Sequence, residues 1–182
     1  LFVILIVSVV VNWNVSEFYF EPNNISNIFR LSIEKAIVVV IMAFVIINAE
    51  IDLSVASVMG LSACVLAYFY NAGMPFYFCV FMAIYVGFVC GAINGLFIAY
   101  LGIPSLVVTL AGLIMYRGAA RILLEDRSVG DFPAWFTGIA QNDFLASFPI
   151  TIFIFIGLFI LCYVILQYST FGRYIYAIGN SR

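Results

Sequence analysis

Polar side chains are rare in this sequence, and five of them occur where they could bind a ligand or an ion. Glu50, Asp52 and Ser54 lie in the stretch NAEIDLSVAS, which separates two long apolar runs, whereas Asn94 and Arg117 lie inside apolar runs. Carboxylate, hydroxyl, amide and guanidinium groups are costly in such surroundings unless they have a partner or a task. These five residues are therefore the candidate site.

The composition indicates that the chain folds in lipid. It has 182 residues, of which 66% are hydrophobic and 9% are charged, with a mean hydropathy of +1.20. A soluble domain is about half apolar and about a quarter charged. Too few charged groups remain to cover a folded surface in water. The net charge of −2 gives no basic face for nucleic acid or anionic headgroups.

Apolar blocks divide the chain into segments that should span a bilayer. Five of the six blocks have about 17–25 residues, enough to cross it as helices. Helices and closed barrels are the structures that satisfy their backbone in lipid, and the blocks lack the period of two expected of barrel strands. We predict an all-α, polytopic transmembrane bundle with about six spans and polar loops at 12–30 and 125–148. The blocks are residues 1–11, 31–48, 53–70, 76–100, 104–124 and 149–168.

Both ends of the sequence look truncated. Leu1 is not a methionine, and the first block is only about 16 Å long at 1.5 Å per residue, roughly half of a hydrocarbon core. The sequence ends on the polar residues GNSR without a closing helix. We interpret residues 1–182 as one transmembrane domain, the N-terminal portion of a longer protein.

The stretch around Asp52 permits two interpretations. Asp52 directly precedes Leu53, where the third helix is expected to begin, so its carboxylate could accept the unpaired backbone donors of the first turn. Ser54 could cap the helix one turn deeper. Glu50 is less well explained by capping. The stretch is either a turn at the membrane interface or a broken helix near a pathway.

Three glycines, Gly87, Gly91 and Gly95, are spaced by four residues and share one helix face. This pattern lets another backbone approach closely. We predict helix packing inside the subunit, with a homodimer seam or a substrate wall as alternatives. Asn94 lies beside this ridge, and its amide must find a partner in the bundle.

Arg117 and the nearby acidic residues suggest no catalytic centre. Arg117 lies deeper in its apolar block than Arg121, so it either snorkels or pairs with Glu125 or Asp126, or it belongs to a pathway. The sequence has no histidine, and its four cysteines lie in apolar runs without CxxC spacing. We predict no catalytic residue, no metal site and no cofactor.

Four ordered stretches carry a specific resemblance. EIDLSVAS (50–57), NGLFIAYLGIPSLVVTLAGL (94–113), YRGAARILLEDRSVGDFP (116–133) and FGRYIYAIGNS (171–181) together resemble the membrane permeases of sugar-importing ABC transporters, the ribose, xylose, rhamnose and autoinducer group. IPSLVVTLAGL and LLEDRSVGDFPAWF look most like the rhamnose-type branch. The group commonly has GGIDLSVGS, from which Ala49, Glu50 and Ala56 depart.

The resemblance implies a multi-pass permease in the bacterial inner membrane that imports a monosaccharide, rhamnose-like or related, by alternating access and performs no chemistry itself. It implies three protein partners: a cytoplasmic ATP-binding subunit, an extracytoplasmic sugar-binding protein and a second permease copy or homologue. A proton-coupled secondary transporter using Glu50 and Asp52 and a structural membrane subunit remain alternatives.

The charge count and the resemblance disagree about orientation. The resemblance puts the face with residues 49–52, 101–103 and 169–182 in the cytoplasm. The positive-inside rule favours the opposite face, because four basic residues flank it and two flank the first: Arg30, Lys35, Arg121 and Arg127 against Arg173 and Arg182. We follow the resemblance, since four motifs outweigh a margin of two charges.

Overall fold

The fold is given by a computed structural model, which describes residues 2–16, 18–125, 127–141, 143–145 and 148–181. The chain divides into two compact units. The first combines Leu1–Ile41 with Ala134–Ser169, and the second combines Met42–Pro133 with Thr170–Arg182.

The first unit consists mainly of helices with exposed apolar side chains. Neither α1 nor α7 has a buried residue among those described. Such all-round apolar surfaces are typical of helices that lie in lipid. The elements are α1 (Phe2–Val15), the first part of α2 (Pro22–Ile47), α6 (Ala134–Gln141), two short antiparallel strands β1 (Asp143–Leu145) and β2 (Phe148–Pro149), and α7 (Ile150–Tyr168).

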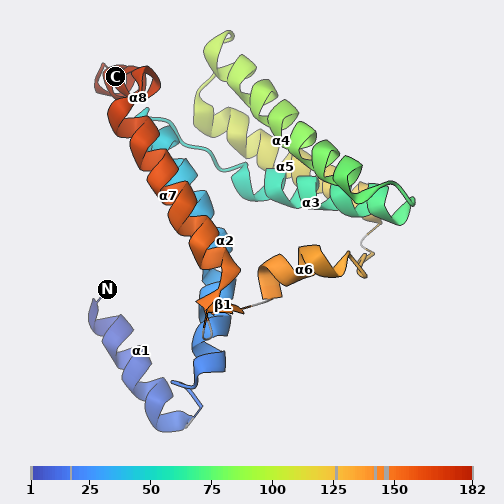
Figure 1. The fold of residues 1–182 in the computed structure, drawn as a ribbon. Helices are drawn as coiled ribbons and strands as arrows, with labels where there is room; N and C mark the ends of the chain where they lie inside the picture. The colour runs from blue at the N-terminus through green and yellow to red at the C-terminus, as the bar shows by residue number, and fades with distance from the viewer. Residues whose placement is uncertain (1, 17, 126, 142, 146–147, 182) are drawn as a thin grey trace. The chain divides into compact units, whose positions relative to one another are not determined.

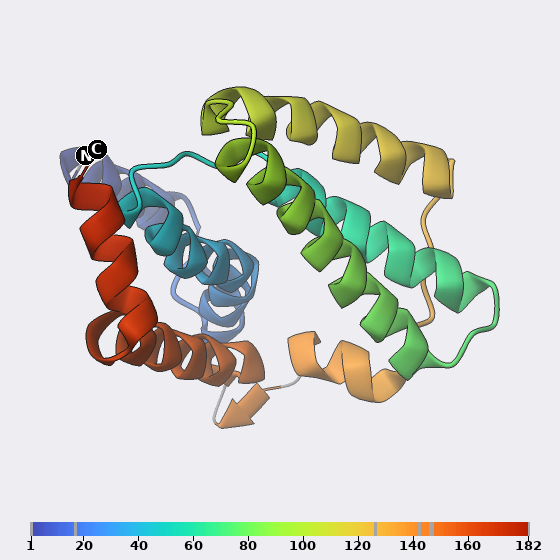
Figure 2. The same cartoon turned by 90° about the horizontal axis from the view of Figure 1, so that it is seen from above.

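The second unit contains the packed part of the chain. Figures 1 and 2 show α3, α4 and α5 side by side, and α3 packs against both of the others. Buried residues occur on all three helices, including Val65, Cys79 and Val108. The elements are the end of α2, then α3 (Val55–Asn71), α4 (Phe76–Ala99), α5 (Ser105–Leu124) and α8 (Thr170–Asn180).

Glycine and proline residues form the turns between these helices. Gly73 and Gly102 have φ values of +79° and +66°, in the left-handed region that favours glycine. Pro75 and Pro104 directly precede α4 and α5. A proline there costs no helical hydrogen bond. These four residues let three helices fold back on one another.

The helical fold class is confirmed: each predicted apolar block forms a helix. Among the described residues, α4, α5 and α7 are long and apolar enough to cross a membrane, whereas α1 and α3 are apolar but shorter. The shorter length of α3 reflects where it begins. Its first residue is Val55 rather than Leu53, because the preceding residues form an extended segment.

The two predicted loops contain more helix than expected. Residues 12–15 continue α1, and α2 begins at Pro22 instead of near Leu31. Proline suits a first helical turn, since its φ is already helical and its missing N–H would have no partner there. In the second loop, residues 134–141 form α6.

The end of α2 is a tight helix stop. The N–H of Glu50 donates to the carbonyl of Val45 at 3.1 Å, and the N–H of Ala49 donates to the carbonyl of Ile46 at 2.9 Å. Ala49 has a φ of +60°. These two bonds, together with the left-handed conformation of Ala49, form a Schellman motif. The left-handed position of this motif is usually occupied by glycine. The chain therefore leaves α2 abruptly and enters the extended segment.

The amphipathic helix α8 packs on this same end of α2. The rings of Phe44 and Phe171 lie 6.4 Å apart. A Cβ at Gly179 would collide with the carbonyl oxygen of Ile47, so the two backbones approach closely at that point. Gly172 and Ile175 are the buried residues of α8.

Candidate functional site

An extended segment, residues 50–53, connects α2 to Ser54, the N-cap residue of α3, and is held by the first turns of α5. The N–H of Ile51 donates to Ser105 Oγ at 3.3 Å. The single hydroxyl hydrogen of Thr109 is shared between the Ser105 carbonyl, 2.7 Å from Oγ1, and the Ile51 carbonyl, 3.3 Å from it. Thr109 is 1% exposed. Side chains of α5 thus supply backbone partners that a helix would otherwise have provided.

Asp52 anchors the other end of this segment. Its Oδ1 accepts the N–H of Ser54 at 2.8 Å and the Oγ–H of Ser54 at 2.7 Å. Ser54 occupies the N-cap position of α3 but makes no side-chain bond to the helix. The Asp52 carboxylate therefore fixes the cap residue, close to the positive end of the helix dipole.

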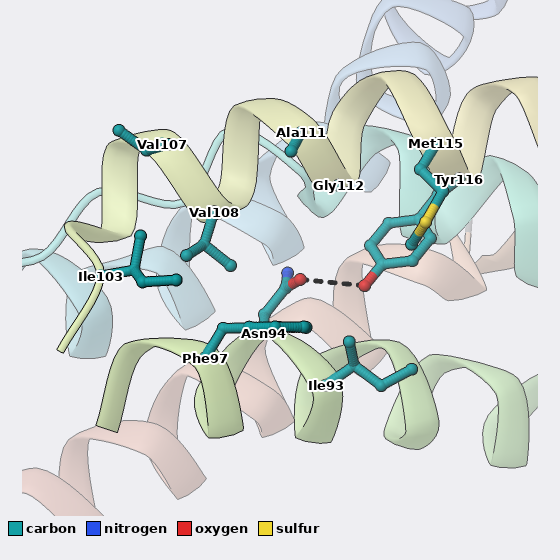
Figure 3. Close-up of a pocket in the computed structure, with 10 residues that line it drawn as sticks. All are labelled: Ile93, Asn94, Phe97, Ile103, Val107, Val108, Ala111, Gly112, Met115 and Tyr116. Carbon is teal, nitrogen blue, oxygen red and sulfur yellow. Dashed lines mark hydrogen bonds between the residues drawn. The ribbon is translucent and has the colours of Figure 1, made fainter. Parts of the chain in front are cut away.

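A chain of hydrogen bonds continues from Ser54 into α4 and α5. Asn94 Nδ2 donates to Ser54 Oγ at 2.9 Å, and the Tyr116 hydroxyl donates to Asn94 Oδ1 at 2.9 Å. The same hydroxyl lies 3.2 Å from the carbonyl of Cys90. Figure 3 shows Asn94 and Tyr116 pointing toward each other from facing helices. The extended segment, α4 and α5 are joined at one buried point.

Gly112 provides the space for this junction. A Cβ at this position would lie 3.0 Å from Tyr116 Cε2, 3.3 Å from Asn94 Oδ1 and 3.4 Å from Ser54 Cβ. These separations are at or below ordinary van der Waals contact, and the hydrogen bonds limit how far the neighbours can move. The absence of a side chain at Gly112 is therefore what lets Ser54, Asn94 and Tyr116 meet.

An apolar groove of about 390 Å³ opens between α4 and α5 beside the junction. Figure 3 shows its lining: Ile93, Asn94, Phe97, Ile103, Val107, Val108, Ala111, Gly112, Met115 and Tyr116. The amide of Asn94 and the hydroxyl of Tyr116 are already bonded to each other. This groove consequently suits an apolar group better than a sugar.

A second cavity, of about 410 Å³, lies beside Glu50. Glu50 and Ser105 bring a carboxylate and a hydroxyl to it, and Gly102 belongs to the turn before α5. Such a mixture of polar and apolar groups is suited to a hydroxyl-rich solute. The cavity is lined by Glu50, Ile98, Gly102, Ile103, Pro104, Ser105 and Leu106.

Comparison with known proteins assigns the family. The model for the permease component of branched-chain amino acid transport systems matches residues 24–182. The chain belongs to this permease family. Its length differs from that of its relatives, since the chain spans about half the length of the curated proteins it matches.

The relatives of this permease include import permeases for ribose and for autoinducer 2. Ribose import permease protein RbsC of Haemophilus influenzae is 30% identical over 189 residues, covering 99% of this chain and 57% of that protein. Autoinducer 2 import system permease protein LsrD of Yersinia pestis and of Yersinia pseudotuberculosis is 35% identical over 152 residues, covering 80% of this chain and 45% of each relative. The resemblance to this group is confirmed. No solved structure matches significantly.

The permease brings three of the five predicted site residues together. Asp52, Ser54 and Asn94 are joined by hydrogen bonds. The expected cap at Asp52 needs correction, because Ser54 is the N-cap and Asp52 accepts its N–H. Leu53 belongs to the extended segment and not to the helix.

The other two predicted residues lie elsewhere in the permease. Glu50 faces the second cavity. Arg117 is exposed on α5. Glu125, one of the partners considered for Arg117, forms an exposed ion pair with Arg127 at 3.0 Å, and Asp126 lies outside the described residues.

The glycine ridge of the permease is only partly in contact with its own chain. A Cβ at Gly87 would lie 3.4 Å from Ser62 Oγ on α3, whereas a Cβ at Gly91 or Gly95 would meet nothing within 4 Å in the described part of the chain. Packing by Gly91 and Gly95 therefore stays a prediction.

Sequence reasoning missed Tyr116, Thr109 and Gly112. Each had a weak signal. Tyr116 and Gly112 are four residues apart on one helix face, and Thr109 lies three residues before Gly112 on the same side. A face of small and polar residues inside an apolar helix indicates a buried polar contact, but it does not identify the partner.

Proposed function

We propose that this chain is the N-terminal portion of the transmembrane subunit of an ATP-binding-cassette importer that carries a monosaccharide across the membrane by alternating access. The observation that carries the proposal is its similarity to import permeases for ribose and autoinducer 2. The resemblance of IPSLVVTLAGL to the rhamnose-type branch makes a rhamnose-like sugar the first substrate to test.

The proposal assigns the energy source to partner subunits. A cytoplasmic ATP-binding subunit would hydrolyse ATP, an extracytoplasmic protein would deliver the sugar, and a second permease copy or homologue would complete the path through the bacterial inner membrane. The chain would undergo the conformational change without catalysing a reaction.

Within this proposal, the sugar passes the cavity beside Glu50. The Glu50 carboxylate and the Ser105 hydroxyl can hydrogen-bond to sugar hydroxyls. Asp52, Ser54 and Asn94 shape the path by positioning the segment, because the polar atoms that join them are bonded to one another. Arg117 is a further candidate on the exposed side of α5.

Uptake by the complete transporter in liposomes tests the proposal. Rhamnose, ribose and an unrelated hexose would be offered with the ATP-binding subunit and the binding protein present. We expect uptake that requires ATP and survives a protonophore. Glu50→Gln should raise the KM for sugar, with Glu21→Gln, at an exposed position before α2, as a matched control. Uptake that is indifferent to ATP would contradict the proposal.

The Asp52 substitutions separate this function from proton-coupled transport. Asp52→Asn keeps an oxygen that can accept the Ser54 N–H and should be mild. Asp52→Ala removes that acceptor, with a cost of about 1 kcal/mol typical of a lost cap. Asp52→Lys should be worst because it puts a cation at the positive end of α3. A proton carrier would instead make Asp52→Asn as inactive as Asp52→Ala.

Orientation is tested by thiol labelling in a background without the four native cysteines. We expect Gly130→Cys to react with a membrane-impermeant reagent from outside the cell, and Ser181→Cys only from the cytoplasm. Labelling of position 181 from outside would show that the charge count should have been preferred to the resemblance.

A further inference from the structure

The charge of the Asp52 carboxylate determines which groups donate and which accept hydrogen bonds throughout the buried junction. An ionised Asp52 can only accept, so Ser54 Oγ donates its hydrogen to Asp52 Oδ1. A hydroxyl has one hydrogen, so toward Asn94 the same oxygen must accept, and it does so from Asn94 Nδ2. The carbonyl oxygen of the amide is then turned toward Tyr116, whose hydroxyl must donate.

We infer that Asp52 orients a four-residue relay, in which Tyr116 donates to Asn94, Asn94 to Ser54, and Ser54 to Asp52. The relay fastens the extended segment to α4 and α5, so that α3, α4 and α5 move as one body during transport. The movement rests on the proposed function, whereas the orientation of the relay does not. Asn94 and Tyr116 are thus positioning residues for the segment that borders the Glu50 cavity.

Burial explains why the relay resists separation of these helices. Ser54, Asn94 and Tyr116 are 1%, 7% and 3% exposed. Pulling the segment away from α4 would leave a buried hydroxyl and a buried amide without partners, and little water is available to replace them. Moving the three helices together keeps every bond.

The relay transmits orientation and not protons. The amide of Asn94 stands between two hydroxyl groups, and an amide neither gains nor loses a proton readily near neutral pH. The Tyr116 hydroxyl also lies 3.2 Å from the Cys90 carbonyl of α4, which can share the hydroxyl's single hydrogen with Asn94 Oδ1 as the longer branch of a bifurcated bond. The chain of bonds therefore serves as a mechanical link between segment and helices.

Replacing a donor of the relay by an acceptor tests the direction of its hydrogen bonds. Asn94→Asp puts a second acceptor beside Ser54, whose single hydrogen is already used, and should lower the melting temperature of the purified permease by about 2–4 °C. Adding Asp52→Ala removes the acceptor at the other end, which frees the Ser54 hydroxyl hydrogen for the new carboxylate. We expect the double variant to lose less stability than the two single variants lose together.

Two controls distinguish this compensation from a general effect of charge. Asp131→Asn removes the same charge outside the relay, because Asp131 contacts Tyr70 through its backbone carbonyl, and its effect should simply add to that of Asn94→Asp. Asn94→Ala cannot accept the freed hydrogen, so Asp52→Ala should not compensate for it either. Equal compensation by Asp52→Ala and Asp131→Asn would overturn the oriented relay. These measurements need no transport activity.

A disulfide between α3 and α4 tests whether the helices move together. A Cβ at Gly87 would lie 3.4 Å from Ser62 Oγ, so Ser62→Cys with Gly87→Cys places two sulfurs within bonding reach. The four native cysteines would be replaced; the Cys90 contact in the relay uses only its backbone carbonyl. We expect the disulfide to form in the assembled transporter and to leave uptake unchanged.

Reduction of this disulfide provides the internal comparison. Uptake that is lost on oxidation and restored by reductant would show that α3 and α4 separate in the cycle, which would overturn the single-body part of the inference. Failure of the disulfide to form would overturn the α3–α4 packing on which it rests. A transporter that fails in both states, while the unsubstituted protein is also inactive toward every sugar, would instead contradict the proposed function.

Discussion

Two glycines on neighbouring helices have opposite surroundings. Gly112 of α5 is crowded by Ser54, Asn94 and Tyr116, whereas Gly91 of α4 faces open space in the described part of the chain. The same residue type therefore serves two purposes. Gly112 makes room for a contact within the chain, and Gly91 leaves a smooth surface that another helix could approach closely.

The largest effect is expected at Gly112. Gly112→Leu would force a branched side chain into the junction, separate Tyr116 from Asn94, and lose most of the folded permease, since overpacking typically costs about 1–3 kcal/mol and sometimes more. Gly112→Ala should be milder, because the nearest atom is a ring carbon. Membrane levels and melting temperature measure both. Normal stability of Gly112→Leu would show that the junction is loosely packed.

Gly91→Leu should have a smaller and different effect. No described atom lies in its way, so the variant should reach normal membrane levels and keep its melting temperature as an isolated subunit. If the ridge packs against another helix of the transporter, assembly and uptake should fall together. Altered sugar choice with normal assembly would instead indicate a substrate wall.

The order of helices and turns along the chain could be predicted from features that are local in the sequence. Apolar block length predicted the helices, and the turns hold Gly73, Pro75, Gly102 and Pro104, residue types that act within a few positions of themselves. The extra helix at residues 22–30 was missed for a related reason. Polar residues there suggested a loop, whereas Pro22 permits a helix to begin.

Several residues of the site could be predicted from the sequence, but their hydrogen-bond partners could not. Asp52, Ser54 and Asn94 were found because polar groups in apolar surroundings need partners. Their fourth partner, Tyr116, was overlooked because a tyrosine in an apolar helix is common, and the residue that it meets lies 22 positions away. Pairings of this kind depend on how helices face each other, which a single sequence does not encode locally.

The same point applies to the start of α3. Asp52 was assigned as the cap because capping is a local pattern. Ser105 and Thr109, more than 50 positions along the chain, bond to the backbone of Ile51 and favour an extended segment. The helix therefore begins at Val55, two residues later than predicted.

The smallest effect is expected at Ala49, which occupies a left-handed position where glycine is usual. Ala49 has a φ of +60°, a conformation that costs a side-chain-bearing residue about 1–2 kcal/mol. Ala49→Gly would relieve this cost and lose about 0.4–1 kcal/mol through the greater freedom of the unfolded chain.

The balance favours a more stable Ala49→Gly permease, by about 0.5–1 kcal/mol. Gly102→Ala is the matched opposite, because Gly102 has a φ of +66° and open space around its Cα; it should be destabilised to a similar extent. Thermal unfolding of the two variants against the unsubstituted protein measures both signs. If both substitutions lower the melting temperature, Ala49 is not strained in the Schellman motif at the end of α2. The difference between positions 49 and 102 would then have a cause other than backbone conformation.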